Sequence, residues 1–303
     1  MNPQVAIHPA IWTGDFSAEG LVPALDKAAA IGFSHVVVPL RKPEAIDPTA
    51  IARIFASRGL KPINTAGIGL DSDIGSEDKA VQKLGRDRLR RAIALARDMG
   101  SSQINGVFYA PLVKASGPPT PGQMQRSAEV LGVLAEEARA AGVRLAIELV
   151  NRYETNLLNT VAQGLDYLKL AGGSSNLMLH LDTFHMSIEE ADLPAALQAA
   201  LPHLGYFELD QSHRGALSEG SLDLLGLTKR VAAHRYSGMV GIEAFARGRM
   251  APDHANTLAI WRNPFEDSDA LAREGLALIR KAFKERPCGL ISRHYLPWDP
   301  TTS

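Results

Sequence analysis

Short apolar segments alternate with longer amphipathic segments along the whole 303-residue chain. The short segments are continuous and rich in Val, Ile and Leu, as is typical of parallel strands whose two faces are both buried. Glycines that end helices follow several of the longer segments, for example Gly32 and Gly100. The predicted strands are residues 5–8, 35–40, 61–68, 103–109, 144–150, 177–181, 205–210 and 239–245. The predicted helices are residues 18–31, 48–57, 78–99, 123–141, 160–171, 193–201, 222–234 and 268–284.

Eight strand–helix repeats in a chain of this length favour a (β/α)₈ TIM barrel over an open sheet. No G-x-G-x-x-G motif follows the first strand, which weakens a nucleotide-binding alternative. No linker or shift in composition divides the chain. We therefore expect one α/β barrel domain over residues 1–303, with an irregular C-terminal tail at residues 287–303.

Composition narrows the function classes. The formal net charge of −1 gives no electrostatic basis for binding nucleic acid or an anionic membrane. No apolar run reaches the length of a membrane span, and the first residues lack the basic and apolar regions of a secretory signal. The one cysteine, Cys288, excludes an intrachain disulfide and a zinc–thiolate cluster. We expect a soluble globular protein in a reduced, cytoplasmic setting.

Carboxylates lie at the ends of four predicted strands, each within an apolar run: Glu148, Asp182, Glu208 and Glu243. In (β/α)₈ barrels these strand ends carry the active site. A single carboxylate there is explained by a helix cap or by an arginine partner. Four on consecutive strands would repel one another unless a cation lies between them. Ligands that are all oxygen suit Mg²⁺ or Mn²⁺, so the sequence predicts a divalent metal site.

Further polar and aromatic residues follow the same strands, and each has two interpretations. Arg214 holds a substrate oxygen or is a surface arginine, and His185 is a substrate donor or proton relay, or an ordinary loop histidine. Glu154 falls in a segment that also reads as a helix cap. Trp12 and Phe245 form an apolar wall at the site or pack in the core.

Four segments resemble the ketose 3-epimerases, the group that includes D-tagatose, D-allulose and L-ribulose 3-epimerases. The segments are residues 148–160 (ELVNRYETNLLNT), 180–190 (HLDTFHMSIEE), 212–215 (SHRG) and 259–263 (AIWRN). This group belongs to the xylose isomerase-like TIM barrel superfamily. The first two motifs are long and specific, and the similarity extends over nearly the whole chain.

The resemblance implies metal-dependent epimerisation of a free ketose at C3 through a cis-enediolate. Glu148 and Glu243 would be the acid/base pair and also metal ligands, with Asp182 as a further ligand. Glu154, His185 and Arg214 would contact the O1–O3 end of the sugar. The implied cofactor is Mn²⁺, with Mg²⁺ or Co²⁺ as alternatives, and the implied assembly is a homodimer or homotetramer.

Two departures from the family pattern concern the metal and the substrate. Glu208 stands where the family pattern Y-x-H-I-G-E-S-H-R-G has histidine, and residues 36–39 (VVVP) lack an acid that many relatives carry. A shell of Asp182 and three glutamates has one extra negative charge, which favours hard Mn²⁺ or Mg²⁺, or one protonated carboxyl group.

Three alternative functions remain open at this level. An aldose–ketose isomerase would use the same metal site, and a non-catalytic binding barrel would have lost the metal through Glu208. An endonuclease on a related barrel would need a basic groove and more histidine ligands, which the near-neutral charge does not favour. No glycine-rich phosphate loop is evident after the last two strands, which favours a free sugar.

Overall fold

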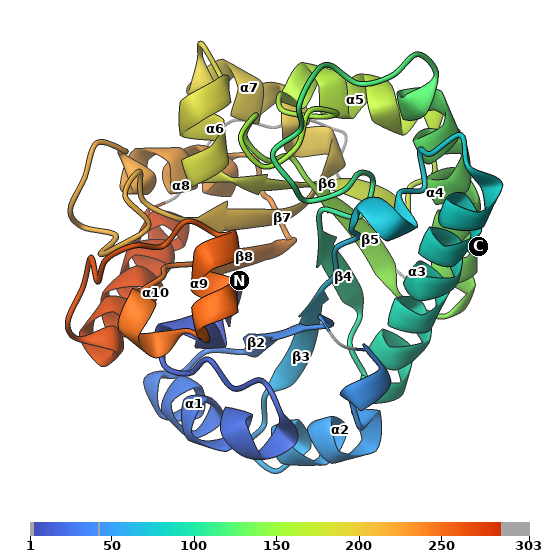
Figure 1. The fold of residues 1–303 in the computed structure, drawn as a ribbon. Coiled ribbons are helices and arrows are strands. Elements are labelled where there is room, and N and C mark those ends of the chain that lie inside the picture. The colour runs from blue at the N-terminus through green and yellow to red at the C-terminus, as the bar shows by residue number, and fades with distance from the viewer. Residues whose placement is uncertain (1–2, 42, 286–303) are drawn as a thin grey trace.

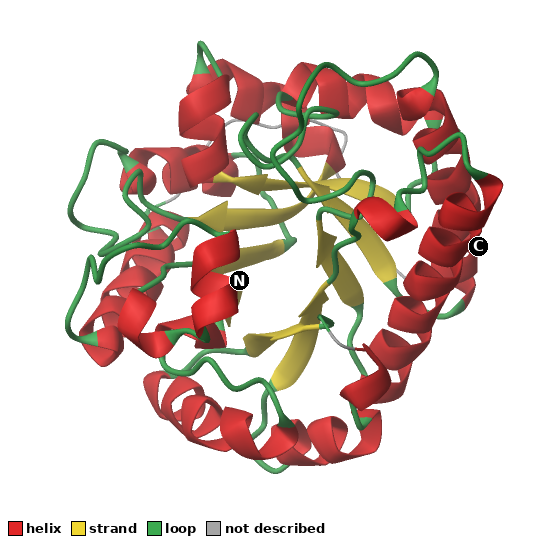
Figure 2. Cartoon of the chain, in the orientation of Figure 1, coloured by secondary structure: helices red, strands yellow, loops and turns green. Residues whose placement is uncertain are grey.

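The computed structural model describes residues 3–41 and 43–285, and these form a closed barrel of parallel strands inside a ring of helices (Figure 1). The strand order is β1 to β8 around the barrel, with β8 paired to β1. Figure 2 shows the strands as a closed ring with helices on the outside. This confirms the predicted (β/α)₈ architecture. The strands are β1 Gln4–Ile7, β2 His35–Pro39, β3 Lys61–Thr65, β4 Gln103–Gly106, β5 Arg144–Glu148, β6 Leu177–Asp182, β7 Leu204–Leu209 and β8 Met239–Ile242.

Helices connect the strands in the predicted order, and two further short helices occur near the C-terminal ends of the strands. Aspartates cap several of them, as Asp47 and Asp78 do by accepting hydrogen bonds from first-turn amides. The predicted tail at residues 287–303 lies outside the described residues. The helices are α1 Ala18–Ile31, α2 Pro48–Ala56, α3 Lys79–Met99, α4 Gln123–Ala140, α5 Val161–Leu170, α6 Thr183–Glu189, α7 Leu193–Ala200, α8 Leu224–Ala233, α9 Pro252–Thr257 and α10 Ser268–Lys284.

The segment after β6 differs from its prediction. No helix was predicted between residues 181 and 193, but the chain turns at once into α6, because Asp182 is the last residue of β6 and also caps the helix through Phe184 N at 2.6 Å. The strands β3, β4, β5 and β8 each end two or three residues earlier than predicted. The residues after β4, such as Val107 and Phe108, are apolar because loops and helices bury them, although they lie outside the strand ladder.

A small group of residues on the strands forms a separate cluster inside the barrel: Ala6, Val37, Ile63, Tyr206 and Met239. Their strand neighbours Val36 and Val38 instead belong to the large core between strands and helices, as the alternation of side chains along a strand requires. The inner cluster fills the barrel and supports the strand ends above it.

A third cluster lies beyond the ends of β1 and β8. It consists of Ala10, Phe245, Met250, Ala255 and Ile260, and Phe16 and Leu258 pack against it. In Figure 1 the helix of this segment, α9, stands inside the outer ring of helices, beside β8. Among the described residues, no helix combines the length and apolar character needed to cross a membrane.

The end of β4 depends on a glycine, which gives a first prediction. Gly106 has φ +121°, and a methyl group there would lie 2.3 Å from the carbonyl oxygen of Ala66. Gly142 also has positive φ (+71°), but in the described part of the chain no heavy atom would lie within 4 Å of its methyl group. Gly106→Ala should therefore lower the free energy of unfolding more than Gly142→Ala, by roughly 1–3 kcal/mol. Urea unfolding measures both, and equal losses would contradict the role of the close approach.

Candidate active site

The four predicted carboxylates meet at one end of the barrel. Glu148 and Asp182 are the last residues of β5 and β6, and Asp182 is paired in register with Glu208 on β7. Glu243 follows β8 directly, and its amide donates to the carbonyl of Leu209 at 3.0 Å. Since the strands are parallel, their ends bring these side chains to the same face.

The carboxylates form a closed ring with four other side chains. Four groups of three residues each place one possible ligand atom per residue within 4.8 Å of the others, and neighbouring groups share a carboxylate. The groups are Glu148–Asp182–His185, Asp182–Asp210–Glu243, His8–Glu208–Glu243 and Glu148–His180–Glu208. In this ring Glu148 and Glu243 are at opposite corners, and Asp182 and Glu208 are at the other two.

Arg214 neutralises one side of the ring. Its Nε donates to Asp210 Oδ2 at 2.7 Å, its terminal NH2 group donates to Glu243, and the same group lies 3.8 Å from Asp182 Oδ2. The guanidinium carbon lies 4.4 Å above the ring centre of Phe184. Although burial lowers it, the pKa of Arg214 is raised well above its usual value by Asp210 and Glu243, so the side chain remains cationic.

One arginine cannot neutralise all the carboxylates of the ring. Burial, with the charge of Glu243 adding to it, raises the pKa of both Glu148 and Glu208 well above the usual value. Burial also raises the pKa of Asp182 to about 7, against the lowering effect of Arg214. These shifts reflect the cost of placing several anions in a buried site, and a bound cation would offset that cost.

Two residues on the barrel side of the ring hold Glu208. His180 Nε2 lies 3.0 Å from Glu208 Oε2, and Tyr206 Oη donates to Glu208 Oε1 at 3.2 Å. His8, at the end of β1, lies 3.5 Å from Glu208 and 3.4 Å from Glu243. Burial lowers the pKa of His180 well below its usual value, so its imidazole is neutral at physiological pH.

Glu154 and His185 lie beside Glu148, as the sequence predicted for neighbours of the site. His185 Nδ1 accepts from the backbone N–H of Asn151 at 3.2 Å, which places the ring proton on Nε2, 3.5 Å from Glu148 Oε1. Asn151 Nδ2 donates to Glu154 Oε1 at 3.1 Å, and Glu154 lies 4.0 Å from Arg214.

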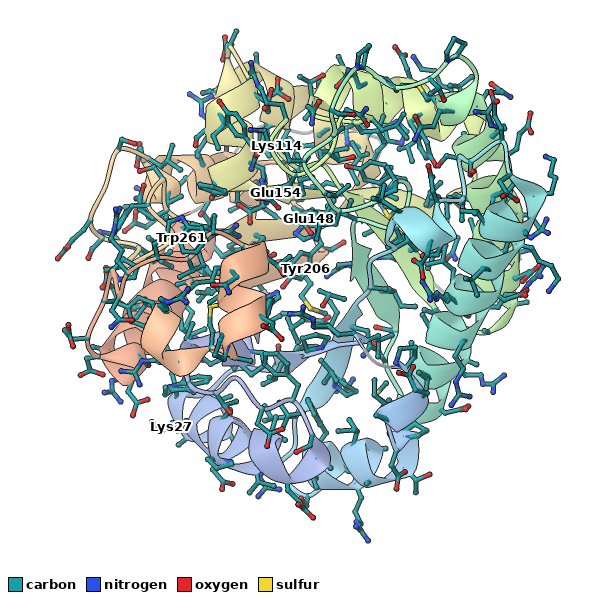
Figure 3. All side chains as sticks on the ribbon, in the orientation of Figure 1. Lys27, Lys114, Glu148, Glu154, Tyr206 and Trp261 are labelled. Atoms are coloured by element: carbon teal, nitrogen blue, oxygen red, sulfur yellow. The ribbon has the colours of Figure 1, made fainter. Side chains whose placement is uncertain are left out.

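A cavity of about 300 Å³ opens onto the ring, at the lower end of the range for small-molecule sites. Its polar lining includes five of the predicted residues: Glu148, Glu154, His185, Arg214 and Glu243. Figure 3 shows Glu148, Glu154 and Tyr206 toward the centre of the barrel, while Lys27 lies on the outside.

The rest of the cavity wall is largely apolar, with Phe16, Leu40, Ile68, Leu112 and Leu258 among its residues. Trp12 is not part of this lining within residues 3–41 and 43–285. Its indole N–H instead donates to Asp269 of α10 at 2.7 Å. Phe16 and Phe245 are the aromatic residues of the cavity wall.

Sequence reasoning did not single out four residues of the site: His8, His180, Tyr206 and Asp210. Two patterns in the sequence could have identified three of these residues. His8 follows the first strand as Glu243 follows the last, and His180 and Tyr206 each lie two positions before a carboxylate on the same strand, hence on the same face. Asp210 gave no signal of its own, because its role depends on the position of Arg214.

The donor atoms fit a divalent cation. In the described part of the chain, three buried atoms of the ring have no hydrogen-bond partner: His180 Nδ1, Asp182 Oδ2 and Asp210 Oδ1. Unpaired buried polar atoms are costly, and carboxylate and imidazole groups are common metal ligands.

The chain is similar in sequence and structure to sugar epimerases. The family model for the xylose isomerase-like TIM barrel matches residues 25–282. The chain is 36% identical to a ketose 3-epimerase of Arthrobacter globiformis, over 91% of this chain and 96% of that protein. It is also 36% identical to an L-ribulose 3-epimerase of Mesorhizobium japonicum, over 97% and 99%. A crystal structure of D-allulose 3-epimerase from Methylomonas sp. in complex with D-allulose superposes with a TM-score of 0.88 at 33% identity, covering 93% of this chain and 97% of that one.

The repulsion within the ring gives a second prediction. In metal-stripped protein, Glu208→Gln should raise the free energy of unfolding, because it removes a carboxyl group whose ionised form is disfavoured by burial and by Glu243, and it retains the side-chain volume. Urea unfolding in the presence of a chelator measures the change. Glu219→Gln, at an exposed position, is the control. A destabilised Glu208→Gln variant would show that the anion is favourable without a metal.

Proposed function

Because the chain belongs to the ketose 3-epimerase family of xylose isomerase-like TIM barrels and is a carbohydrate epimerase, we propose that it inverts C3 of a free ketose through a cis-enediolate. Glu148 and Glu243 are the proposed acid/base pair. The observation that carries this proposal is their position, since they occupy opposite corners of the ring and both line the cavity. A ketose between them presents one face of C3 to each carboxylate.

In this reaction one carboxylate removes the C3 proton and the other returns a proton to the opposite face. A carboxylate base is most effective when its pKa is near the working pH. Burial and the neighbouring acids raise the pKa of Glu148 in this direction. His185 Nε2–H, Glu154 and Arg214 border the same space and are proposed to bind the O1–O3 end of the sugar.

The proposed metal ligands are the carboxylates of Glu148, Asp182, Glu208 and Glu243. These side chains would hold a divalent cation, with Mn²⁺ proposed and Mg²⁺ or Co²⁺ as alternatives, which would supply positive charge to polarise the ketose carbonyl and stabilise the developing enediolate. Two observations support a bound cation: Asp182 Oδ2 has no hydrogen-bond partner among the described residues, and the pKa of Glu148 and of Glu208 is raised, which a cation would reverse.

The names of the relatives guide the choice of substrates. One relative is named for L-ribulose, a pentulose, and one solved structure for D-allulose, a hexulose. A free pentulose or hexulose is the proposed substrate.

Isotope exchange tests the reaction. The chelator-stripped protein, reloaded with Mn²⁺, Mg²⁺ or Co²⁺, is incubated in deuterated water with D-fructose, D-tagatose, L-ribulose and D-erythrulose. We expect metal-dependent deuterium at C3 together with the C3 epimer, measured by NMR. Deuterium at C1 or C2 with an aldose product would indicate an aldose–ketose isomerase instead. Absence of both metal binding and exchange would refute the proposal.

The acid/base pair makes a sharper prediction. Glu148→Gln and Glu243→Gln should each lower the epimerisation kcat by about 10²–10⁴-fold, the usual contribution of a general acid or base. Each variant should still exchange the C3 hydrogen of one epimer only, and the two variants should differ in which epimer, because one base remains on one face.

Bound metal is measured in both variants, so that loss of the cation is not mistaken for loss of a base. Glu219→Gln, a change on the surface, should leave both rates unchanged. If both variants retain exchange with the same epimer, the two carboxylates do not act on opposite faces.

A further inference from the structure

The two halves of the cavity wall differ in charge. The charged residues that border the ring lie at or after the ends of β5 to β8: Glu148, Glu154, Arg214 and Glu243. The opposite half is formed by the ends of β2, β3 and β4 and by the segments that follow them. Of the described residues that line this half, Arg41 alone is charged, and the others, such as Leu40 and Ile68, are apolar or small and neutral.

Arg41 lies across the barrel from the residues that are proposed to bind the O1–O3 end of the sugar. It follows β2 by two positions, and His185 follows β6 by three. Three strands separate β2 from β6 in either direction around the closed ring, so these two strand ends lie opposite each other. His185 is buried and Arg41 is exposed, which places Arg41 at the open end of the cavity. A ketose whose carbonyl end lies beside His185 therefore extends its C4–C6 end toward Arg41.

The guanidinium group of Arg41 is available to a ligand. Within residues 3–41 and 43–285 it forms no hydrogen bond or close ion pair, although the charge of Asp253 acts on it. His254 also lines the cavity and packs edge-on against Phe16, with ring centres 6.1 Å apart. Burial lowers the pKa of His254 to about 4, and the charge of Arg41 acts in the same direction. The open end of the cavity thus combines a permanent cation with a neutral imidazole at physiological pH.

We propose that Arg41 binds the terminal hydroxyl group of the ketose and that the preferred substrate is therefore a hexulose. The inference rests on the proposed function, from which it takes the orientation of the sugar. A guanidinium group donates hydrogen bonds and accepts none, so it suits a hydroxyl oxygen that is not used in the reaction. A tetrulose ends at C4 and does not reach the exposed Arg41. Arg41 is then a residue that determines specificity and takes no part in proton transfer.

Steady-state kinetics with shortened and deoxygenated sugars test this. The substrates are D-fructose, D-tagatose, their 6-deoxy analogues and D-erythrulose. Arg41→Met should lower kcat/KM for the hexuloses by about 3- to 10-fold, the usual effect of one lost hydrogen bond, and mainly through KM. The variant should match the wild-type protein with the 6-deoxy sugars and with D-erythrulose, because these lack the hydroxyl group that Arg41 binds. Arg41→Lys should retain part of the effect, and Arg53→Met, exposed on α2, should change no rate.

The outcomes separate this inference from the proposed function. Equal losses for a hexulose and its 6-deoxy analogue, or no loss with either, would overturn the role of Arg41. Exchange at C3 of L-ribulose but of neither hexulose would also overturn it and leave the proposed function intact. Absence of exchange with every ketose would refute both. The wild-type protein alone provides a further check, since removal of the 6-hydroxyl group should itself lower kcat/KM by about 3- to 10-fold.

Discussion

The concentration of negative charge at one end of the barrel is the constraint on which the site depends. Five carboxylates, those of Glu148, Asp182, Glu208, Asp210 and Glu243, lie within one ring, and the buried Arg214 forms hydrogen bonds with two of them, Asp210 and Glu243. Burial of so many anions is unfavourable without compensation. The barrel permits it because eight paired strands fix the positions of the side chains, whatever the repulsion between them. The raised pKa values are the measure of that cost, and such strained groups are typical of functional sites.

The residues around Glu208 are arranged to accommodate its carboxylate group. Tyr206 and His180 contact its two carboxylate oxygens, and Gly241 on the next strand leaves the space that these groups occupy. A methyl group at Gly241 would lie 2.1 Å from Tyr206 Oη and 2.7 Å from Glu208 Oε1. Glu208 is therefore accommodated by residues of three strands, which is not the pattern of a degraded ligand position in a barrel that has lost its chemistry.

The sequence was sufficient to predict those features of the fold and the site that depend on patterns of neighbouring residues along the chain. The alternation of apolar runs and amphipathic segments was enough for the barrel, and the rule that active sites lie at strand ends brought Glu148 and Asp182 together. These patterns did not predict α6, because Asp182 both ends strand β6 and caps the helix that follows it. The sequence also did not predict the ion pair of Asp210 with Arg214, since this pair requires the left-handed conformation of Arg214, with φ 58°.

Contacts between distant segments set a second limit on prediction. Trp12 follows the first strand as a wall residue of the site would, yet its indole bonds to Asp269, 257 positions away along the chain. The unpaired Nδ1 of His180 is likewise a property of three-dimensional packing, because it depends on how Glu148 and Glu208 approach from neighbouring strands.

The small cluster around α9 has a consequence for how the sugar enters and leaves. Its five buried residues form an apolar unit apart from the large core, and Phe245, Leu258 and His254 from the same segment line the cavity. A segment with its own core can open as a local unit while the strand ladder stays intact. If Phe245 and residues 250–260 separated from Ala10 and Phe16 in this way, the free energy of opening the site would be independent of the global stability of the barrel.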